Sequence, residues 1–271
     1  DAPPEGGLIS SHWEQEHEFL KVRETESGAI DLFTAPFWGC NWSGLRSRLF
    51  DQACSNIHLL SMPNRRRVRQ IGRLAAASGA EFVLFDMEHT GWSVETIRML
   101  LATSVSANTV PLVRIPATDY QFVARVLDMG AMGIMVPMVQ DAEQARNLVQ
   151  FAKYPPVGRR GGAFGISHDN YQGGPAVDKM TSANDETLLI AQIETAKGLE
   201  NVEQIAAVDG IDVLWIGQTD LSNSMGIPAQ FEHPDFQAAV DRIVSVARAA
   251  GKAAGYMGMS LDECENLYQK G

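Results

Sequence analysis

The stretch Phe82-Val-Leu-Phe-Asp86, followed by Val110-Pro-Leu-Val-Arg114 and Gly133-Ile-Met-Val-Pro137, decides the fold. Each run is short and apolar without strict alternation, which is typical of strands buried on both faces of a parallel sheet. Four more runs of this kind lie at residues 57–61, 188–193, 213–216 and 254–257. Helical patterns separate the runs, and such repeated strand–helix units predict parallel strands joined by right-handed crossovers.

The expected helices cover residues 65–78, 93–103, 119–129, 141–153, 196–207, 234–250 and 260–270. No Gly-x-Gly-x-x-Gly follows a strand, which disfavours an open dinucleotide-binding sheet. Distinctive polar residues end most strands, where a (β/α)8 TIM barrel keeps its active site. We therefore expect an α/β barrel over residues 55–271, preceded by an atypical segment, residues 1–54. Seven units are visible, so the eighth βα unit is expected to be missing or replaced.

Composition excludes several classes of protein. The chain has 271 residues and a net charge of −11, whereas a general nucleic-acid binder carries a basic face. No apolar run approaches the length of a membrane span. The three cysteines are too few and scattered for a disulfide framework, and no signal peptide is visible, so a cytoplasmic setting is expected.

Two carboxylates follow neighbouring strands. Glu194 directly follows the run 188–193, and Asp220 comes shortly after the run 213–216. Carboxylates on one small rim repel each other unless a cation lies between them, and Mg²⁺ is often held by one or two carboxylates. The alternative is that each residue belongs to the cap of the helix that follows.

Three further residues are candidates for chemistry. Arg114 ends an apolar strand and needs an anion, which is either a substrate group or a structural partner such as Asp86 or Glu88. His89 lies at a strand end and can carry a proton near neutral pH. Asp128 ends a helix, where a carboxylate faces the negative pole of the helix dipole; a cation or histidine partner would explain it, and simple exposure is the alternative.

Lysine and glycine patterns add two expectations. The chain has 6 lysines and none ends a strand, so an imine-forming aldolase is disfavoured and electron-sink chemistry would need a metal. A Gly-rich, doubly basic loop, residues 154–165, lies in the long connection before the run 188–193. Its length suggests a functional loop or lid over the rim.

Several ordered motifs resemble the HpcH/HpaI aldolase family, the metal-dependent (class II) pyruvate aldolases of the phosphoenolpyruvate/pyruvate barrel superfamily. The motifs are Phe82-Val-Leu-Phe-Asp-Met-Glu-His89, Pro111-Leu-Val-Arg114, Leu127-Asp-Met-Gly130, Val136-Pro-Met-Val139, Tyr154-Pro-Pro-Val-Gly-Arg-Arg-Gly161, Ile190-Ala-Gln-Ile-Glu-Thr195 and Ile216-Gly-Gln-Thr-Asp-Leu-Ser222. The resemblance implies a barrel that reversibly cleaves a 4-hydroxy-2-oxo acid to pyruvate and an aldehyde.

The same resemblance implies roles for individual residues. Glu194 and Asp220 would bind a divalent ion (Mg²⁺, Mn²⁺ or Co²⁺), and Arg114 would stabilise the enolate oxygen. His89 and Asp128 would form an acid/base dyad. The substrate-binding residues would be Gln192, Gly217, Thr219 and Asp220, with the backbone amides of Thr219 and Asp220 receiving the pyruvate carboxylate.

The chain departs from the family in several places. Residues 55–78 match the family's first strand and helix only loosely, and residues 1–54 match nothing in it. The turn most often read as Gly-Pro-x-Asp is Gly217-Gln-Thr-Asp220 here. The last strand and helix, exchanged between subunits in the family's hexamers, are not matched, although a homo-hexamer is otherwise implied. Two other readings stay open: a citrate-lyase-like CoA-ester lyase that shares the barrel and its acidic ligands, and a truncated, non-catalytic paralogue.

Overall fold

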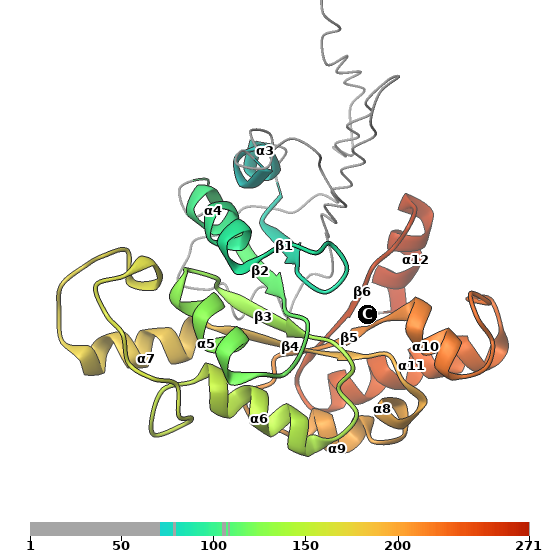
Figure 1. The fold of residues 1–271 in the computed structure, drawn as a ribbon. Helices are drawn as coiled ribbons and strands as arrows, with labels where there is room; N and C mark the ends of the chain where they lie inside the picture. Colours follow the sequence, from blue (N-terminus) through green and yellow to red (C-terminus); the bar gives the residue numbers. More distant parts are fainter. Residues whose placement is uncertain (1–70, 78–79, 105–106, 108, 271) are drawn as a thin grey trace, which may run out of the picture.

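The computed structural model describes residues 71–77, 80–104, 107 and 109–270, and the expectations for residues 1–54 and for the run 57–61 lie outside them. Within the described residues, six parallel strands form one sheet in chain order, and each pairs with the next (Figure 1). The sheet curls as part of a TIM-like barrel. The strands are β1 (Phe82–Asp86), β2 (Val110–Arg114), β3 (Gly133–Val136), β4 (Leu188–Ile193), β5 (Val213–Ile216) and β6 (Ala253–Tyr256).

Helices follow the strands and cover the outer face of the sheet (Figure 1). None of the described helices is long and apolar enough to cross a membrane. They are α3 (Ile71–Ala77), α4 (Val94–Ser104), α5 (Tyr120–Asp128), α6 (Ala142–Ala152), the 3-10 turn η3 (Ser167–Asp169), α7 (Ala176–Glu186), α8 (Ala196–Glu200), α9 (Val202–Ala206), α10 (Gln218–Ser224), α11 (Pro234–Ala249) and α12 (Leu261–Lys270).

Helix α7 was not expected from the sequence, the helix considered after Asp220 already begins at Gln218, and one further expected helix is divided. No residue of α7 is buried, so its sequence carries no apolar period. Helix α10 has only seven residues. The expected helix over 196–207 is interrupted at Asn201, which caps α8 and begins α9.

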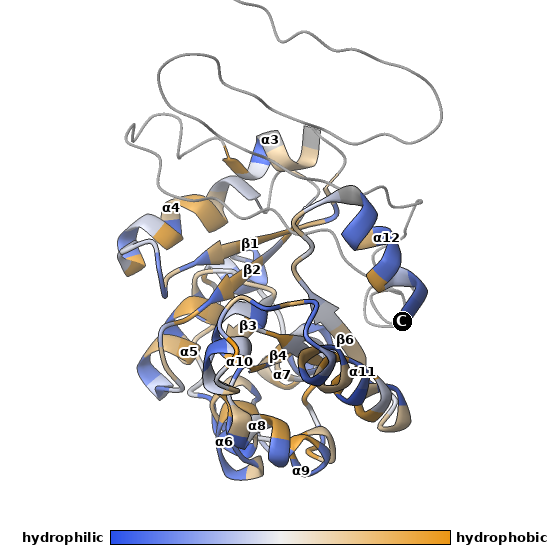
Figure 2. Cartoon of the chain, turned by 90° about the vertical axis from the view of Figure 1, so that its right-hand side faces the viewer, coloured by the Kyte–Doolittle hydropathy of each residue, from blue (hydrophilic) through white to orange (hydrophobic). Residues whose placement is uncertain are grey.

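The strands separate two buried apolar clusters. One packs between the sheet and the helices, and the smaller one lines the inner face of the curled sheet. In Figure 2, strands β1 and β2 are coloured hydrophobic, and the helices beside the sheet carry both hydrophobic and hydrophilic residues. The inner cluster comprises Leu84, Val110, Leu112, Met135, Leu188, Ile190, Val213 and Trp215.

Alternation along the strands then assigns the next residues to the same inner face. Side chains two residues apart share a face, so Asp86 follows Leu84, Arg114 follows Leu112, and Gln192 follows Ile190. The inner face is therefore apolar along the sheet and becomes polar at the carboxyl ends of the strands. This change in polarity positions the candidate site.

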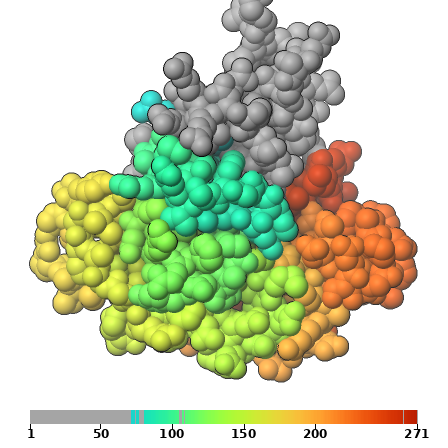
Figure 3. Space-filling model, viewed as in Figure 1, coloured from blue at the N-terminus to red at the C-terminus, as the bar shows by residue number. Residues whose placement is uncertain are grey.

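The long loop after α6 lies at the other end of the strands. It connects the end of α6 to α7 and the start of β4, and Figure 3 shows this segment (yellow) on the flank opposite α10–α12. A cavity of about 280 Å³ lies between the loop and the amino ends of β2, β3 and β4, with Arg160, His168, Thr109, Met132 and Thr187 in its wall. The expectation that this loop covers the carboxyl rim of its own sheet is wrong.

Candidate active site

The register of β1 and β2 places Asp86 beside Arg114 at the carboxyl ends of both strands. The guanidinium donates from Nε to Asp86 Oδ1 at 2.8 Å and from Nη2 to Asp86 Oδ2 at 2.5 Å. Arg114 is 7 % exposed and Asp86 4 %. This two-point contact fixes the plane of the guanidinium, as bidentate arginine–carboxylate pairs do. The structural ion pair considered for Arg114 is present, at the rim where the substrate is expected.

Glu88 and His89 lie next to the Asp86–Arg114 ion pair, on its solvent-exposed side. Glu88 Oε2 lies 3.3 Å from Arg114 Nη1 and 3.5 Å from His89 Nε2. Neither contact has hydrogen-bond geometry, so this buried oxygen makes no hydrogen bond among the described residues. Burial raises the pKa of Glu88, an effect that Arg114 and His89 oppose and that Asp86 and Asp220 reinforce. The side chain of His89 is 56 % exposed, which makes it accessible to a substrate.

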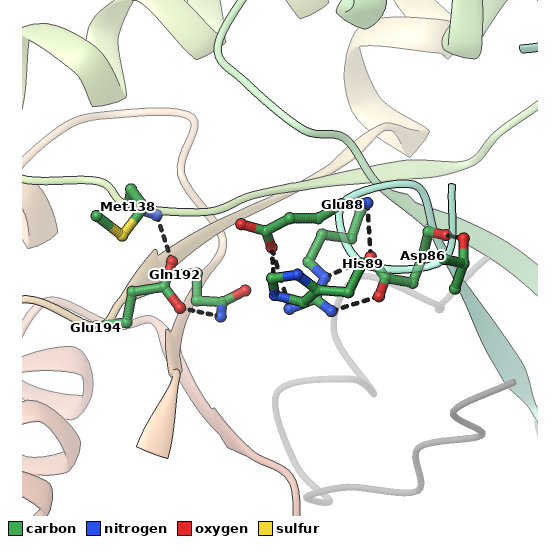
Figure 4. Close-up of polar contacts among 8 residues, drawn as sticks. Asp86, Glu88, His89, Met138, Gln192 and Glu194 are labelled. Atoms are coloured by element: carbon green, nitrogen blue, oxygen red, sulfur yellow. Dashed lines mark hydrogen bonds and ion pairs between the residues drawn. The ribbon is translucent and has the colours of Figure 1, made fainter. Parts of the chain in front are cut away.

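Glu194 lies directly beyond β4 and is 2 % exposed. Its Oε1 accepts the Met138 N–H at 2.6 Å, and its Oε2 accepts a hydrogen bond from Gln192 Nε2. Burial, together with the negative charges of Glu88 and Asp220, raises the pKa of Glu194 to about 7, although the two hydrogen bonds oppose this rise. Figure 4 shows Glu194, Gln192 and Met138 facing Asp86, Glu88 and His89.

Gly217, the residue after β5, leaves no room for a side chain beside this group. A Cβ there would lie 2.4 Å from Glu194 Oε2 and 2.7 Å from Gln192 Nε2. Gln192 is 4 % exposed, and its Oε1 has no partner among the described residues. The amide is therefore held at its nitrogen and offers an unused acceptor in the site.

Thr219 and Asp220 lie in the first turn of α10, whose N-cap is Gly217. Both residues are exposed, and no side chain caps this helix end. The negative charge of Asp220 raises the pKa of both Glu88 and Glu194, so Asp220 lies on the same side of the sheet as these two carboxyl groups. The structure thus gathers Glu194, Asp220, Gln192, Gly217 and Thr219 at one end of the sheet.

Asp128 does not lie with them. It ends α5, and helices run antiparallel to the strands that they follow, so this helix end lies near the amino end of β3. Its Oδ1 accepts a hydrogen bond from Arg160 Nη2 at 2.6 Å, and the side chain of Arg160 is only 2 % exposed. Arg160 is thus the cation partner of Asp128, and the structure does not bring His89 and Asp128 together as a dyad within the chain.

The carboxylates of Glu194 and Asp220 are of the kind that can bind a divalent cation. A carboxylate has four lone-pair sites, and the two hydrogen bonds to Glu194 leave acceptor capacity on both oxygens. Among the described residues, no cluster of three or more His, Cys, Asp and Glu side chains is arranged to hold a metal. Two carboxylates completed by water and substrate oxygens form the open type of site that Mg²⁺ and Mn²⁺ accept.

Sequence reasoning assigned no role to Met138 and considered Asp86 and Glu88 only as partners of Arg114. The period-2 pattern along β1 from Leu84 to Asp86 is the signal that places Asp86 toward the inner face, and Glu88 follows just beyond the end of this strand. Met138 contributes through its backbone, which its residue type does not reveal.

Comparison with known proteins finds the same architecture in enzymes. The HpcH/HpaI aldolase/citrate lyase family matches residues 69–271. A 2-keto-3-deoxy-L-rhamnonate aldolase of Klebsiella pneumoniae is 38% identical over 187 residues, covering 69% of this chain and 70% of the relative. A 4-hydroxy-2-oxo-heptane-1,7-dioate aldolase of Salmonella dublin is 37% identical over 184 residues, covering 68% and 70%. The crystal structure of an HpcH/HpaI aldolase from Desulfitobacterium hafniense, 32% identical, superposes with a TM-score of 0.77 over 83% of this chain and 86% of that one.

Proposed function

The chain belongs to the HpcH/HpaI aldolase/citrate lyase family and is a carbon–carbon lyase, and on that premise we propose that it reversibly cleaves a 4-hydroxy-2-oxo acid to pyruvate and an aldehyde. The observation that carries the proposal is the buried carboxylate of Glu194, which lies at the same rim as the rigidly held Arg114. The Glu194 carboxylate is suited to binding a cation, and the Arg114 guanidinium is suited to stabilising a developing anion.

Glu194 and Asp220 would hold the divalent ion. The raised pKa of Glu194 supports this, because a buried carboxylate surrounded by like charges is poorly stabilised until a cation joins it. When bound, the ion withdraws electrons from the substrate carbonyl. Mg²⁺, Mn²⁺ and Co²⁺ all suit a carboxylate site.

Arg114 supplies positive charge to the enolate. Its Nε and Nη2 are engaged by Asp86, so the guanidinium cannot turn, and its charge is fixed before the enolate forms. Such preorganised donors are among the largest single contributions to catalysis, commonly about 10²–10³-fold in kcat. Asp86 acts here as the residue that orients Arg114.

His89 is the proton carrier. In cleavage it takes the proton of the 4-hydroxyl as the C3–C4 bond breaks, the aldehyde leaves, and a proton returns to C3 to give pyruvate. The oxygen 3.5 Å from His89 Nε2 belongs to Glu88, so Glu88 replaces Asp128 as the proposed carboxylate partner. The substrate carboxylate would lie at the backbone amides of Thr219 and Asp220, in the first turn of α10.

Two of the described lysines, Lys153 and Lys252, are positioned against an imine mechanism. Lys153 Nζ donates to the backbone oxygens of Asn184 and Thr187, and Lys252 Nζ donates to those of Val208 and Ile211. These acceptors precede β4 and β5, so both ammonium groups lie at the amino ends of the strands. An imine-forming lysine would have to lie at the opposite rim.

The test is release of pyruvate from a short-chain 4-hydroxy-2-oxo acid, with and without a chelator, followed by return of Mn²⁺. The proposal expects loss of activity and its recovery. Full activity in chelator would refute the metal role, whereas no cleavage of any such acid under metal-replete conditions would refute the aldolase assignment. Tight binding of CoA would instead favour the CoA-ester lyase alternative. The closed (β/α)8 barrel and the homo-hexamer belong to the same proposal.

A further inference from the structure

Met138, just beyond the end of β3, has a backbone conformation that its residue type disfavours. Its φ is 56°, in the left-handed region. A residue with a Cβ rarely enters this region, and a β-branched residue there is a true outlier. A feature of this kind persists when the surrounding structure requires it, and such features concentrate at functional sites.

The left-handed conformation of Met138 alters the directions of two successive backbone N–H groups, those of Met138 and Val139. In a regular parallel strand, neighbouring residues direct their N–H groups to opposite sides. Here Met138 donates to Glu194 Oε1 at 2.6 Å and Val139 donates to Gln192 O at 3.2 Å, so both groups point toward the end of β4. Successive N–H groups converge in this way when a left-handed or turn residue breaks the alternation, and they form a concavity that receives an anion.

The side chain of Met138 does not explain the position. It is 46 % exposed, and it extends away from Glu88 and His89 while its N–H points to Glu194 (Figure 4). Pro137, which precedes it, has no N–H, so the ordinary ladder has already lost a donor at this point. The backbone of Met138 is what contacts the site.

We infer that Met138 is a positioning residue: its left-handed backbone, not its side chain, aims the N–H that holds Glu194 in place for a divalent cation. The inference rests on the proposed function, because it takes Glu194 as a metal ligand. Groups that orient a metal ligand typically change metal affinity about 10–100-fold when they are lost.

The test compares variants by backbone tolerance and by side-chain chemistry. Met138→Gly removes the whole side chain but accepts a positive φ, whereas Met138→Val keeps an apolar side chain and disfavours it. We expect the Kd for Mn²⁺, measured by titration calorimetry, to stay within about twofold of wild type for Met138→Gly and to weaken about 10–100-fold for Met138→Val. If the side chain matters instead, the order reverses and glycine is the poorer variant.

A second pair guards against a variant that fails to fold. Asparagine tolerates the left-handed region, and leucine matches methionine in size and character but tolerates it less well. Met138→Asn should therefore bind Mn²⁺ at least as tightly as Met138→Leu. The matched control is Tyr171→Val, because Tyr171 has a φ of 58° in the loop at the other end of the strands. It should lower the unfolding temperature without changing the Kd.

The outcomes separate the inference from its premise. Equal Mn²⁺ affinity in all Met138 variants, or weaker binding by Met138→Gly than by Met138→Val, overturns the inference alone. A wild-type chain that binds no Mn²⁺ overturns both the inference and the metal role of Glu194. As a further readout, Met138→Val should need more Mn²⁺ to reach half-maximal pyruvate release, with less change at saturating Mn²⁺.

Discussion

Gly217→Ala tests the packing around Glu194. The φ of Gly217 is −89°, so alanine is conformationally allowed and only sterics oppose it. The new Cβ would lie 2.4 Å from Glu194 Oε2, 2.6 Å from Glu194 Cβ and 2.7 Å from Gln192 Nε2, whereas contacts of this kind normally need roughly 3.5 Å. The Gly217 N–H donates to Ile193 O at 3.1 Å, which ties this backbone to β4. The carboxylate must therefore move by about 1 Å.

Such overpacking costs about 1–3 kcal/mol. For a chain of this size, that lowers the unfolding temperature by roughly 2–12 °C. Displacement of Glu194 should also weaken Mn²⁺ about 10–100-fold. Differential scanning fluorimetry and Mn²⁺ titration measure the two effects, and Gly173→Ala is the control because its added Cβ would meet nothing within 4 Å. Wild-type Mn²⁺ affinity and turnover in Gly217→Ala would refute the role given to Glu194.

Three further predictions concern other parts of the chain. Arg114→Lys keeps the charge but loses the two-point contact, so kcat should fall about 100-fold or more in steady-state pyruvate assays, and unchanged kcat would contradict the role of Arg114. Asp128→Asn should leave kcat within about twofold and lower the unfolding temperature, because the buried Arg160 loses its charged partner. A large loss of kcat with normal stability would instead support an acid/base role for Asp128 together with His89. Burial raises the pKa of Asp169, but the Lys179 ammonium and the Gly165 N–H outweigh it and hold the pKa at about 2. A carboxyl group whose pKa is lowered in the folded chain stabilises the fold at pH values above its ordinary pKa, and this stabilisation is lost as the pH falls toward the lowered pKa. Proteolysis within residues 155–175 should therefore rise between about pH 4 and 2. The same pH response in Lys179→Met would contradict this.

Much of the sheet was predictable because its strands are buried on both faces. All six described strands match apolar runs, with bounds differing by at most one residue. Helix α7 could not be recognised by its pattern, since it buries no residue and needs no apolar stripe. Helix α10 has seven residues, too few for two turns of periodicity.

The candidate site was predictable where it depends on strand ends. Arg114, Glu194 and Asp220 were all expected at one rim, because parallel strands bring their carboxyl ends together. The predicted pairing of His89 with Asp128 is not formed within the chain, because Asp128 ends a helix, and a helix that follows a strand runs back toward the amino end of that strand. The contribution of Met138 was not visible, because no residue type other than glycine, asparagine or aspartate signals a left-handed backbone.

The central claim is that Glu194 holds a divalent ion that aldol cleavage requires. Its most direct test is Mn²⁺ titration of the wild-type chain and of Glu194→Gln, with pyruvate release measured on the same samples. The account predicts stoichiometric Mn²⁺ and chelator-sensitive cleavage for wild type, and neither for Glu194→Gln. A Glu194→Gln chain that keeps its Mn²⁺ affinity and its activity would contradict it.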